Sequence, residues 1–442
     1  MHRRLPALVG IGLIAALMGP GWLAVPTAAQ GNITVTYWET FGDQDGGVND
    51  LVIETFKEAH PNVTVERVFV PFGDMSIKLR TALASGQGPD LIYADQQPAF
   101  LGSYVKAGQI LPLDRAFVEY GWDQRVFGWA QKRVTYFDRI YGVGHEVEDL
   151  MLMYNGRIFD ELGLEVPTTL EELETVMQTI KDNSSYTPMM LATGGGGPWN
   201  GIHMINAIAY ATMDVSKVLE TTPQGTGSYT DPDWLNVLKI YEKWAKAGYF
   251  YEDANAVDWE GHWALLCAGQ AAMLAQGTWL FKPISECEAE NPELFEFKVA
   301  PFPSAAGRPY QAYVGIGSAW YLSAEVAKDP ELHAAALDLL DALISPEAAI
   351  HWVQDAQLFP AVPFDQSQVT LTEQQKVALE VIELVGSEGG GPVPICFNNS
   401  AEELDIWQSV VQGLFAGRMT PEVAIEQLEV ALVASQQEWQ SE

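Results

Sequence analysis

The chain has 442 residues with a formal net charge of −34, and 48% of them are hydrophobic while 19% are charged. Such an excess of acid excludes nucleic acids and anionic membrane surfaces as natural partners, because both repel a negative protein. The hydrophobic share suffices for a full core, and the length fits two domains.

The N-terminus has the pattern of a secretory signal peptide. Arg3 and Arg4 give a positive start, residues 8–18 form an apolar core, and small residues lead up to Ala29. We expect residues 1–29 to be removed and the protein to be exported. An uncleaved anchor is the alternative, but the prolines and glycine within 20–26 interrupt the apolar run. No cysteine ends the segment, so a lipid-anchored terminus is not indicated.

Three cysteines remain after this cleavage: Cys267, Cys287 and Cys396. An exported protein can hold a disulfide, and the first two, which are close in sequence, are the expected pair. Without CxxC spacing the three indicate neither a zinc site nor a redox site. We therefore expect no metal and no cofactor.

The first hundred residues of the mature chain alternate between strand and helix patterns. We expect strands at 32–38, 63–70 and 89–94, and helices at 48–59 and 76–85. This β-α-β-α-β order predicts a parallel sheet with helices on its faces. The ligand crevice of such a sheet lies beyond the carboxyl ends of its strands. Residues 38–43 and 95–97 follow two of those ends.

The most informative stretch is 141–155, where three acids (Glu146, Glu148 and Asp149) precede the apolar run 150–153. A short, bounded apolar run predicts a buried strand. Burying unpaired charge is costly, so acids at the start of such a strand indicate a cleft. A strand end that emerges into solvent is the alternative from this segment alone.

The rest of the chain is mostly helical. A helix is expected at 171–181 with Thr168 or Thr169 as its N-cap. Four glycines at 194–197 precede Trp199. Further strands are expected at 270–274, 297–303 and 314–322, and further helices at 98–107, 202–213, 233–247, 330–344, 346–354, 372–385, 400–415 and 421–437.

Catalytic signatures are missing from the sequence. It contains no HExxH, no GxSxG and no phosphate-binding GxxxxGK[ST] motif. Glu146 and Glu148 alternate along one strand, which places them on one face about 7 Å apart. In a glycosidase the two carboxylates instead flank the sugar from opposite sides. The protein is therefore not expected to be an enzyme, although an exported glycosidase stays as an alternative.

Aromatic, acidic and amide residues gather at the expected strand ends and loops. Sugars offer apolar faces that stack on rings, and hydroxyls that need planar donors and acceptors. Trp199 is a strong candidate, since a glycine-rich loop rarely leads a tryptophan into the core. The candidates from this pattern are Trp38, Glu39, Asp43, Asp95, Gln96, Glu148, Trp199, Asn200, Trp279, Tyr313 and Asn398.

A series of motifs gives the chain a family resemblance over 31–442. It resembles the extracellular solute-binding proteins of ABC importers, in the large sugar-binding group that includes the maltose-binding proteins. The motifs are ITVTYWETFG (33–42), GQGPDLIYAD (86–95), ILPLD (110–114), YGVGHEVEDLMLMYN (141–155), FDELGLEVPTTLEEL (159–173), AGQAAMLAQGTW (268–279), VAPFPSAAG (299–307) and GRMTPEVAIEQL (417–428).

The resemblance implies an α/β protein with the two-lobe, type II periplasmic-binding-protein-like fold. The N-terminal lobe is expected at 30–143 and 302–350, and the C-terminal lobe at 144–301 and 351–442. Crossings between the lobes are expected near 143–147, 300–303 and 350. It further implies a monomer in the periplasm or at the outer face of the cell envelope. This monomer would capture a carbohydrate, expected to be an oligosaccharide, by hinge closure and deliver it to a cognate ABC permease.

The resemblance also implies roles for single residues. Glu148 matches the hinge-strand acid that accepts sugar hydroxyls, and Trp199 and Trp279 match stacking rings. Asp95 and Gln96 match polar contacts of the first lobe, and Gly315 fits the family pattern. A receptor of the same fold for a polyamine or a glycerol phosphodiester is the alternative. A phosphate ligand calls for Arg or Lys, and the loops at 38–43, 95–97 and 199–200 have neither.

Overall fold

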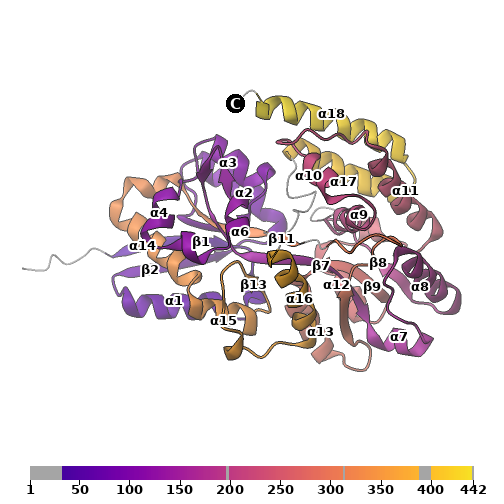
Figure 1. The fold of residues 1–442 in the computed structure, drawn as a ribbon. Coiled ribbons are helices and arrows are strands. Elements are labelled where there is room, and N and C mark those ends of the chain that lie inside the picture. Colours follow the sequence, from indigo (N-terminus) through magenta and orange to yellow (C-terminus); the bar gives the residue numbers. More distant parts are fainter. Residues whose placement is uncertain (1–31, 196–198, 312–313, 388–399, 441–442) are drawn as a thin grey trace, which may run out of the picture.

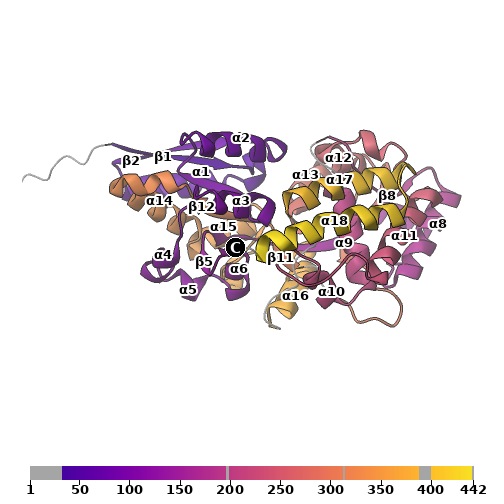
Figure 2. The same ribbon diagram turned by 90° about the horizontal axis from the view of Figure 1, so that it is seen from above.

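The computed structural model describes residues 32–195, 199–311, 314–387 and 400–440. Two lobes lie side by side, each with its own sheet, and a long strand joins them (Figures 1 and 2). Among these residues no helix is both long and apolar enough to cross a membrane. The expected signal peptide and Cys396 lie outside the described residues.

The first lobe is built on a five-stranded sheet with the order β2-β1-β3-β12-β6. The first three strands run parallel, as the alternating pattern predicted, and β12 is antiparallel to both β3 and β6. The parallel strands therefore end at the same edge. The strands are β1 (Ile33–Glu39), β2 (Val63–Phe69), β3 (Leu91–Asp95), β6 (Val143–Gly144) and β12 (Ser318–Leu322).

Helices cover both faces of this sheet (Figures 1 and 2). Helices α1, α14 and α15 follow the predictions to within one residue, and α2 begins four residues before its expected start. The short helices between Asp114 and Arg133 carry too few turns to leave a periodic pattern. The helices are α1 (Val48–Ala59), α2 (Phe72–Ala84), α3 (Ser103–Lys106), α4 (Asp114–Glu119), α5 (Trp122–Arg125), α6 (Gly128–Arg133), α14 (Pro330–Leu343) and α15 (Pro346–Gln354). Shorter elements are η1 (Gly42–Asp45), η2 (Pro98–Gly102), η5 (Ala324–Lys328), and the hairpin β4 (Thr135–Tyr136) and β5 (Arg139–Ile140).

The second lobe is built on a sheet with the order β10-β7-β9-β8. Its strands are β7 (Glu146–Asn155), β8 (Thr187–Met190), β9 (Ala271–Gly277) and β10 (Phe297–Pro301). Its helices are α7 (Gly156–Leu162), α8 (Leu170–Asn183), α9 (Trp199–Thr212), α10 (Val215–Glu220), α11 (Pro232–Ala247), α12 (Trp259–Cys267), α13 (Phe281–Glu290), α16 (Glu373–Ser387), α17 (Ala401–Phe415) and α18 (Pro421–Gln440), with η3 (Ala254–Ala256) and η4 (Thr278–Leu280).

Local signals explain two features of this lobe. Thr169 caps α8 through a capping box, in which its hydroxyl accepts from the Glu172 backbone and the Glu172 carboxylate accepts from the Thr169 backbone. Cys267 at the end of α12 is bonded to Cys287 of α13, as the sequence predicted. The bond ties these two neighbouring helices together.

Strand β7 runs between the lobes, and we call it the hinge strand. Its N-terminal half pairs with β11 (Val314–Ile316) and β13 (Phe359–Pro360), and its C-terminal half pairs with β9 and β10. Helix α15 still packs against α1, whereas α16 packs against β7 and β10. These contacts favour a passage to the second lobe after Gln354, and the expected crossing near 350 stays a prediction. The short helix η6 (Gln366–Gln368) lies in this passage, and the other lobe bounds stay predictions.

Candidate functional site

Two adjoining cavities, of about 420 and 110 Å³, lie between the lobes, and we call them together the cleft. Both are lined by Thr40, Phe72 and Asp95 of the first lobe and by Trp199 of the second. The smaller cavity is further lined by Phe41, Gln44, Tyr93, Glu146, Glu148, His203, Trp259, Trp279, Leu280, Ser318 and Leu358. The larger extends between α2 and α17, where Asp405 and Gln408 line it.

The hinge strand supplies two of the carboxylates of the cleft. Glu146 and Glu148 are only 7% and 6% exposed, and both line the smaller cavity. A Cβ at Gly317 would lie 1.6 Å from Glu148 Oε1, so only glycine leaves room for this carboxylate. Glu148 Oε2 has no hydrogen-bond partner among the described residues. Asp149 is fully buried and lines neither cavity.

The acids of the cleft hold their protons more tightly than free carboxyls do. Burial raises the pKa of Glu148 well above its ordinary value, and the nearby Glu146 and Asp95 raise it further. Burial raises the pKa of Glu146 to about 7 against the hydrogen bond that Tyr93 donates at 3.2 Å. Burial likewise raises the pKa of Asp95 to about 7, despite its hydrogen bonds with Gln97 and Ser318.

Aromatic rings from both lobes line the same space. Phe72, at the start of α2, lies with its ring centre 6.3 Å from Trp199 and 6.2 Å from Trp259 across the cleft. The Trp279 ring covers Gly277, where a Cβ would lie 1.8 Å from Trp279 Cζ3. Flat apolar surfaces placed beside carboxylates suit a ligand with an apolar face and a polar rim.

A chain of buried polar groups orients the ring of His203. Its Nδ1 lies 2.7 Å from Gln276 Oε1, and Gln276 Nε2 lies 3.2 Å from His262 Nε2. His203 packs edge-on against Trp279 with 5.1 Å between ring centres. Burial lowers the pKa of His203 to about 4 and that of His262 to about 3, so both rings are neutral near pH 7.

Trp199 belongs to a helix, whereas the sequence analysis expected that helix to begin after it. Trp199 and Asn200 open helix α9, which begins three residues before the expected start at 202. Trp199 lines both cavities, but Asn200 is fully buried and accepts a hydrogen bond from the Ala192 backbone N–H at 2.8 Å. Asn200 therefore holds α9 to the end of β8, and it lines neither cavity.

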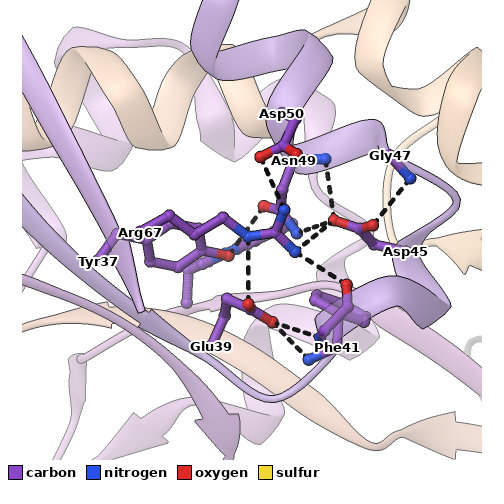
Figure 3. A network of polar contacts seen from close by, with 10 residues as sticks. Tyr37, Glu39, Phe41, Asp45, Gly47, Asn49, Asp50 and Arg67 are labelled. Atoms are coloured by element: carbon purple, nitrogen blue, oxygen red, sulfur yellow. Dashed lines mark hydrogen bonds and ion pairs between the residues drawn. The ribbon is translucent and has the colours of Figure 1, made fainter. Parts of the chain in front are cut away.

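Glu39 is committed to an ion network behind the cleft (Figure 3). Arg67 donates to Glu39 at 3.1 Å and to Asp45 and Asp50 at 2.8 Å each. Glu39 also accepts from the backbone N–H groups of Phe41 and Gly42. The network thus fixes the loop after β1, and through it the ring of Phe41, rather than offering Glu39 to a ligand.

Three other sequence candidates lie beside the cleft rather than in its lining. Trp38 packs against the apolar cluster beneath α2 and α3. Gln96 is buried and donates to the Ile316 backbone carbonyl at 2.8 Å, which links the end of β3 to the hinge. Gly315 pairs with Glu148 in the hinge ladder. Tyr313, Asn398 and the side chain of Asp43 lie outside the described part of the chain.

Sequence reasoning missed several lining residues. Phe72 and its neighbours follow β2, so the rule about strand ends, applied to that strand as well, would have found them. Phe41 lies within the loop 38–43 but was not chosen as a candidate, and Gln44 lies one residue past that loop. Trp259, His203 and Asp405 lie on helices of the second lobe, where nothing in the sequence pattern distinguishes a cleft-facing residue from a core one.

The chemistry of the cleft is acidic and aromatic. None of its described lining residues is Lys or Arg, although Arg80 interacts with Tyr104, which lines the larger cavity. No group of three or more His, Cys, Asp or Glu side chains has metal-binding geometry within the described ranges. The arrangement is therefore suited to holding an organic molecule between the lobes.

Comparisons with known proteins agree with this geometry. The family model described as bacterial extracellular solute-binding protein matches residues 52–373. The chain belongs to this family. Among solved structures, a chitin oligosaccharide binding protein superposes with a TM-score of 0.82 at 19% identity, covering 92% of this chain and 99% of that one. A maltose/maltodextrin-binding domain from Bdellovibrio bacteriovorus gives 0.69 at 19% identity, covering 92% and 100%. The fold is thus the expected two-lobe binding-protein fold.

Curated relatives share slightly more of the sequence but cover less of the chain. The maltotriose-binding protein of Pyrococcus abyssi is 24% identical over 312 residues, which is 68% of this chain and 61% of the relative. An uncharacterised ABC transporter extracellular-binding protein of Pyrococcus horikoshii is 24% identical over 281 residues, or 62% and 61%. The match spans about six tenths of the length of these relatives. They are named as binding proteins, not as enzymes.

Proposed function

We propose that this protein is the substrate-binding component of an ABC importer and captures a carbohydrate in the cleft by hinge closure. The observation that carries the proposal is that both lobes line the same cavities, with Phe72 and Asp95 on one side and Trp199 on the other. A ligand held there contacts both lobes at once. It therefore binds the closed form more tightly than the open form and shifts the population toward closure.

Strand β7 has the position expected of a hinge. It belongs to the ladder with β11 and β13 at one end and to the sheet of the second lobe at the other. Glu146 and Glu148 lie on that strand and line the cleft, so the ligand would touch the hinge itself. In this proposal the protein is an exported monomer without catalytic activity, and the transmembrane subunits of the importer recognise the closed pair of lobes.

The rings and carboxylates favour a sugar, expected to be an oligosaccharide, over a glycerol phosphodiester. A phosphate needs Arg or Lys, and neither lines the cleft among the described residues. A polyamine receptor remains the main competing function, because carboxylates attract it. An exported glycosidase is disfavoured, since Glu146 and Glu148 occupy one face of one strand instead of opposite sides of a substrate.

The proposal predicts that Trp279→Ala weakens sugar binding by about ten-fold or more, because a stacking ring is lost from the lining of the smaller cavity. Tyr186→Ala is the matched control, since Tyr186 lies in the second lobe and lines neither cavity. Intrinsic tryptophan fluorescence, titrated with mono- and oligosaccharides, glycerophosphodiesters and polyamines, measures the binding. X-ray scattering measures closure as a smaller radius of gyration with ligand.

The same titrations decide between the competing functions. If polyamines change the tryptophan signal and no sugar does, the carbohydrate proposal fails. If the bound sugar is recovered with new reducing ends, the protein is a glycosidase. Equal losses in Trp279→Ala and Tyr186→Ala would place the sugar outside the cleft.

A further inference from the structure

The charges around the smaller cavity do not balance. Three carboxylates line it (Asp95, Glu146 and Glu148), and no Lys or Arg is found among its described lining residues. Its one histidine, His203, is neutral near pH 7 because burial lowers its pKa to about 4. Asp405 adds a fourth carboxyl in the larger cavity. Buried acids are normally paired with a cation or coordinate a metal.

Glu148 is the centre of this imbalance. It is 6% exposed, and its Oε2 atom has no partner in the part of the chain that the structure describes. Glycine at 317 leaves the space into which the carboxylate extends. Glu146 on the same strand and Asp95 on β3 both act to raise the pKa of Glu148. A positive group placed among the three would relieve both the missing hydrogen bond and the repulsion.

A metal ion does not fit this need. Asp95, Glu146 and Glu148 do not converge with metal-binding geometry, and no other described set of side chains does. The surrounding rings point instead to an organic cation. Tyr93 contacts Glu146, and Phe41, Trp259 and Trp279 line the same cavity. Aromatic faces attract ammonium groups as well as apolar C–H faces.

We propose that the carbohydrate bound in the cleft is an amino sugar whose protonated amine lies among Glu148, Glu146 and Asp95. This inference rests on the proposed function and narrows it to one substrate class. The ammonium donates hydrogen bonds to the unpartnered Glu148 oxygen and neutralises part of the acid cluster, while the ring stacks on the tryptophans. The rings favour an amino sugar over a linear polyamine, since a polyamine has no flat face with which to cover them.

The test compares sugars that differ at one substituent, which is charged in the amino form and neutral in the hydroxyl and N-acetyl forms. Glucose, galactose and mannose, their 2-amino-2-deoxy forms and their N-acetylated amino forms are titrated by calorimetry at pH 7. The β-1,4-linked trimers of glucose, glucosamine and N-acetylglucosamine and the polyamine spermidine complete the panel. We expect at least one amino sugar to bind about ten-fold or more tightly than its hydroxyl and N-acetyl counterparts, a difference of about 1.4 kcal/mol.

A pair of variants assigns the preference to the acid. Glu148→Gln keeps the shape and removes the charge, so it should abolish the preference for the amino sugar over its neutral counterpart, and this ratio of affinities is the readout. Glu165→Gln removes an exposed acid between α7 and α8 and should leave the preference intact. Circular dichroism checks that both variants fold.

The results distinguish the amino-sugar inference from the broader proposal of carbohydrate capture. A neutral or N-acetylated sugar that binds as tightly as its amino form overturns the amino-sugar inference and leaves carbohydrate capture standing. Binding of spermidine without any sugar overturns both. Binding of no amine-bearing sugar also overturns the inference, as does a preference that survives in Glu148→Gln.

Discussion

The protein buries two groups of acids, and their surroundings are opposite in charge compensation. Glu39 and Asp45 are almost fully buried, and Arg67 contacts both of them (Figure 3). Glu146 and Glu148 are buried to a similar degree, and no described Lys or Arg lines the cavity that they face. Burial by itself therefore does not distinguish the two groups.

The difference lies in what compensates the charge. Glu39 accepts two backbone N–H groups as well as Arg67, and the loop after β1 is fixed as a result. Burial still raises the pKa of Glu39, against the pull of Arg67. The pKa of Glu148 is raised well above its ordinary value, by burial and by two neighbouring acids. A satisfied acid organises structure, whereas an unsatisfied one keeps its binding capacity for a ligand.

The largest effect on stability should come from removing Arg67, the cation that pairs with Glu39 and Asp45. Arg67→Met leaves Glu39 and Asp45 buried without a counter-charge, and we expect it to lower the free energy of unfolding by about 3 kcal/mol. Urea denaturation followed by circular dichroism measures the loss. Sugar binding should also weaken, because the loop that carries Phe41 loses its anchor.

Arg115→Met is the matched control for this change. Arg115 also pairs with a glutamate, Glu119, but its side chain is 87% exposed. Exposed pairs contribute about 0–1 kcal/mol, so this variant should remain close to the wild type. If Arg67→Met lowers the free energy of unfolding no more than Arg115→Met does, Arg67 does not compensate the buried acids. The contrast between the two groups of acids is then wrong.

At Glu148, which has no counter-charge, we expect a substitution to raise the free energy of unfolding rather than lower it. Glu148→Gln removes a buried carboxylate that no cation neutralises, so it should raise the free energy of unfolding of the ligand-free protein by about 1–2 kcal/mol at pH 8. The same urea experiment measures the gain, with Glu165→Gln as a control that should change stability little. A destabilised Glu148→Gln would mean that the carboxylate is compensated in the free protein, contrary to the geometry at Gly317.

The sequence predicted the framework of the first lobe well because its signals are local. Alternation over 32–38 and helical spacing over 48–59 recur as β1 and α1, and parallel strands then follow from the order of elements. Thr169 and the Cys267–Cys287 pair were also within reach of short-range patterns. The rule about strand ends led to Asp95, which does line the cleft.

The same reasoning was less successful where contacts are distant in sequence. Glu39 and Arg67 are 28 residues apart and meet only because β1 and β2 pair in register. Because the sequence does not show this register, Glu39 was predicted to bind the ligand. Trp259 and His203 reach the cleft through the orientation of α12 and α9, which depends on how the helices pack. A residue type at a strand end indicates a position, but its hydrogen-bond partners decide its role.

The smallest predicted effect is a dependence of stability on pH. The pKa values of Asp95 and Glu146 are raised to about 7, against ordinary values near 4, so the folded state binds more protons than the unfolded state between these limits. Stability from these groups is complete below pH 4 and is lost as the pH rises through 7. Burial lowers the pKa values of His145, His203 and His262 to between about 3 and 4, which opposes this trend below pH 6.5.

At pH 6.5 the three histidines are still about half protonated in the unfolded state, so the wild-type curve alone does not isolate the acids. The difference between the wild type and Asp95→Asn/Glu146→Gln does, because both proteins keep the histidines. From pH 6.5 to pH 8 we expect the free energy of unfolding of the ligand-free wild type to fall by about 1 kcal/mol relative to the double variant. Glu165→Gln should follow the wild type, and urea midpoints at several pH values measure the curves. Parallel curves for the wild type and the double variant would mean that the cleft acids are ionised, and compensated, in the free protein.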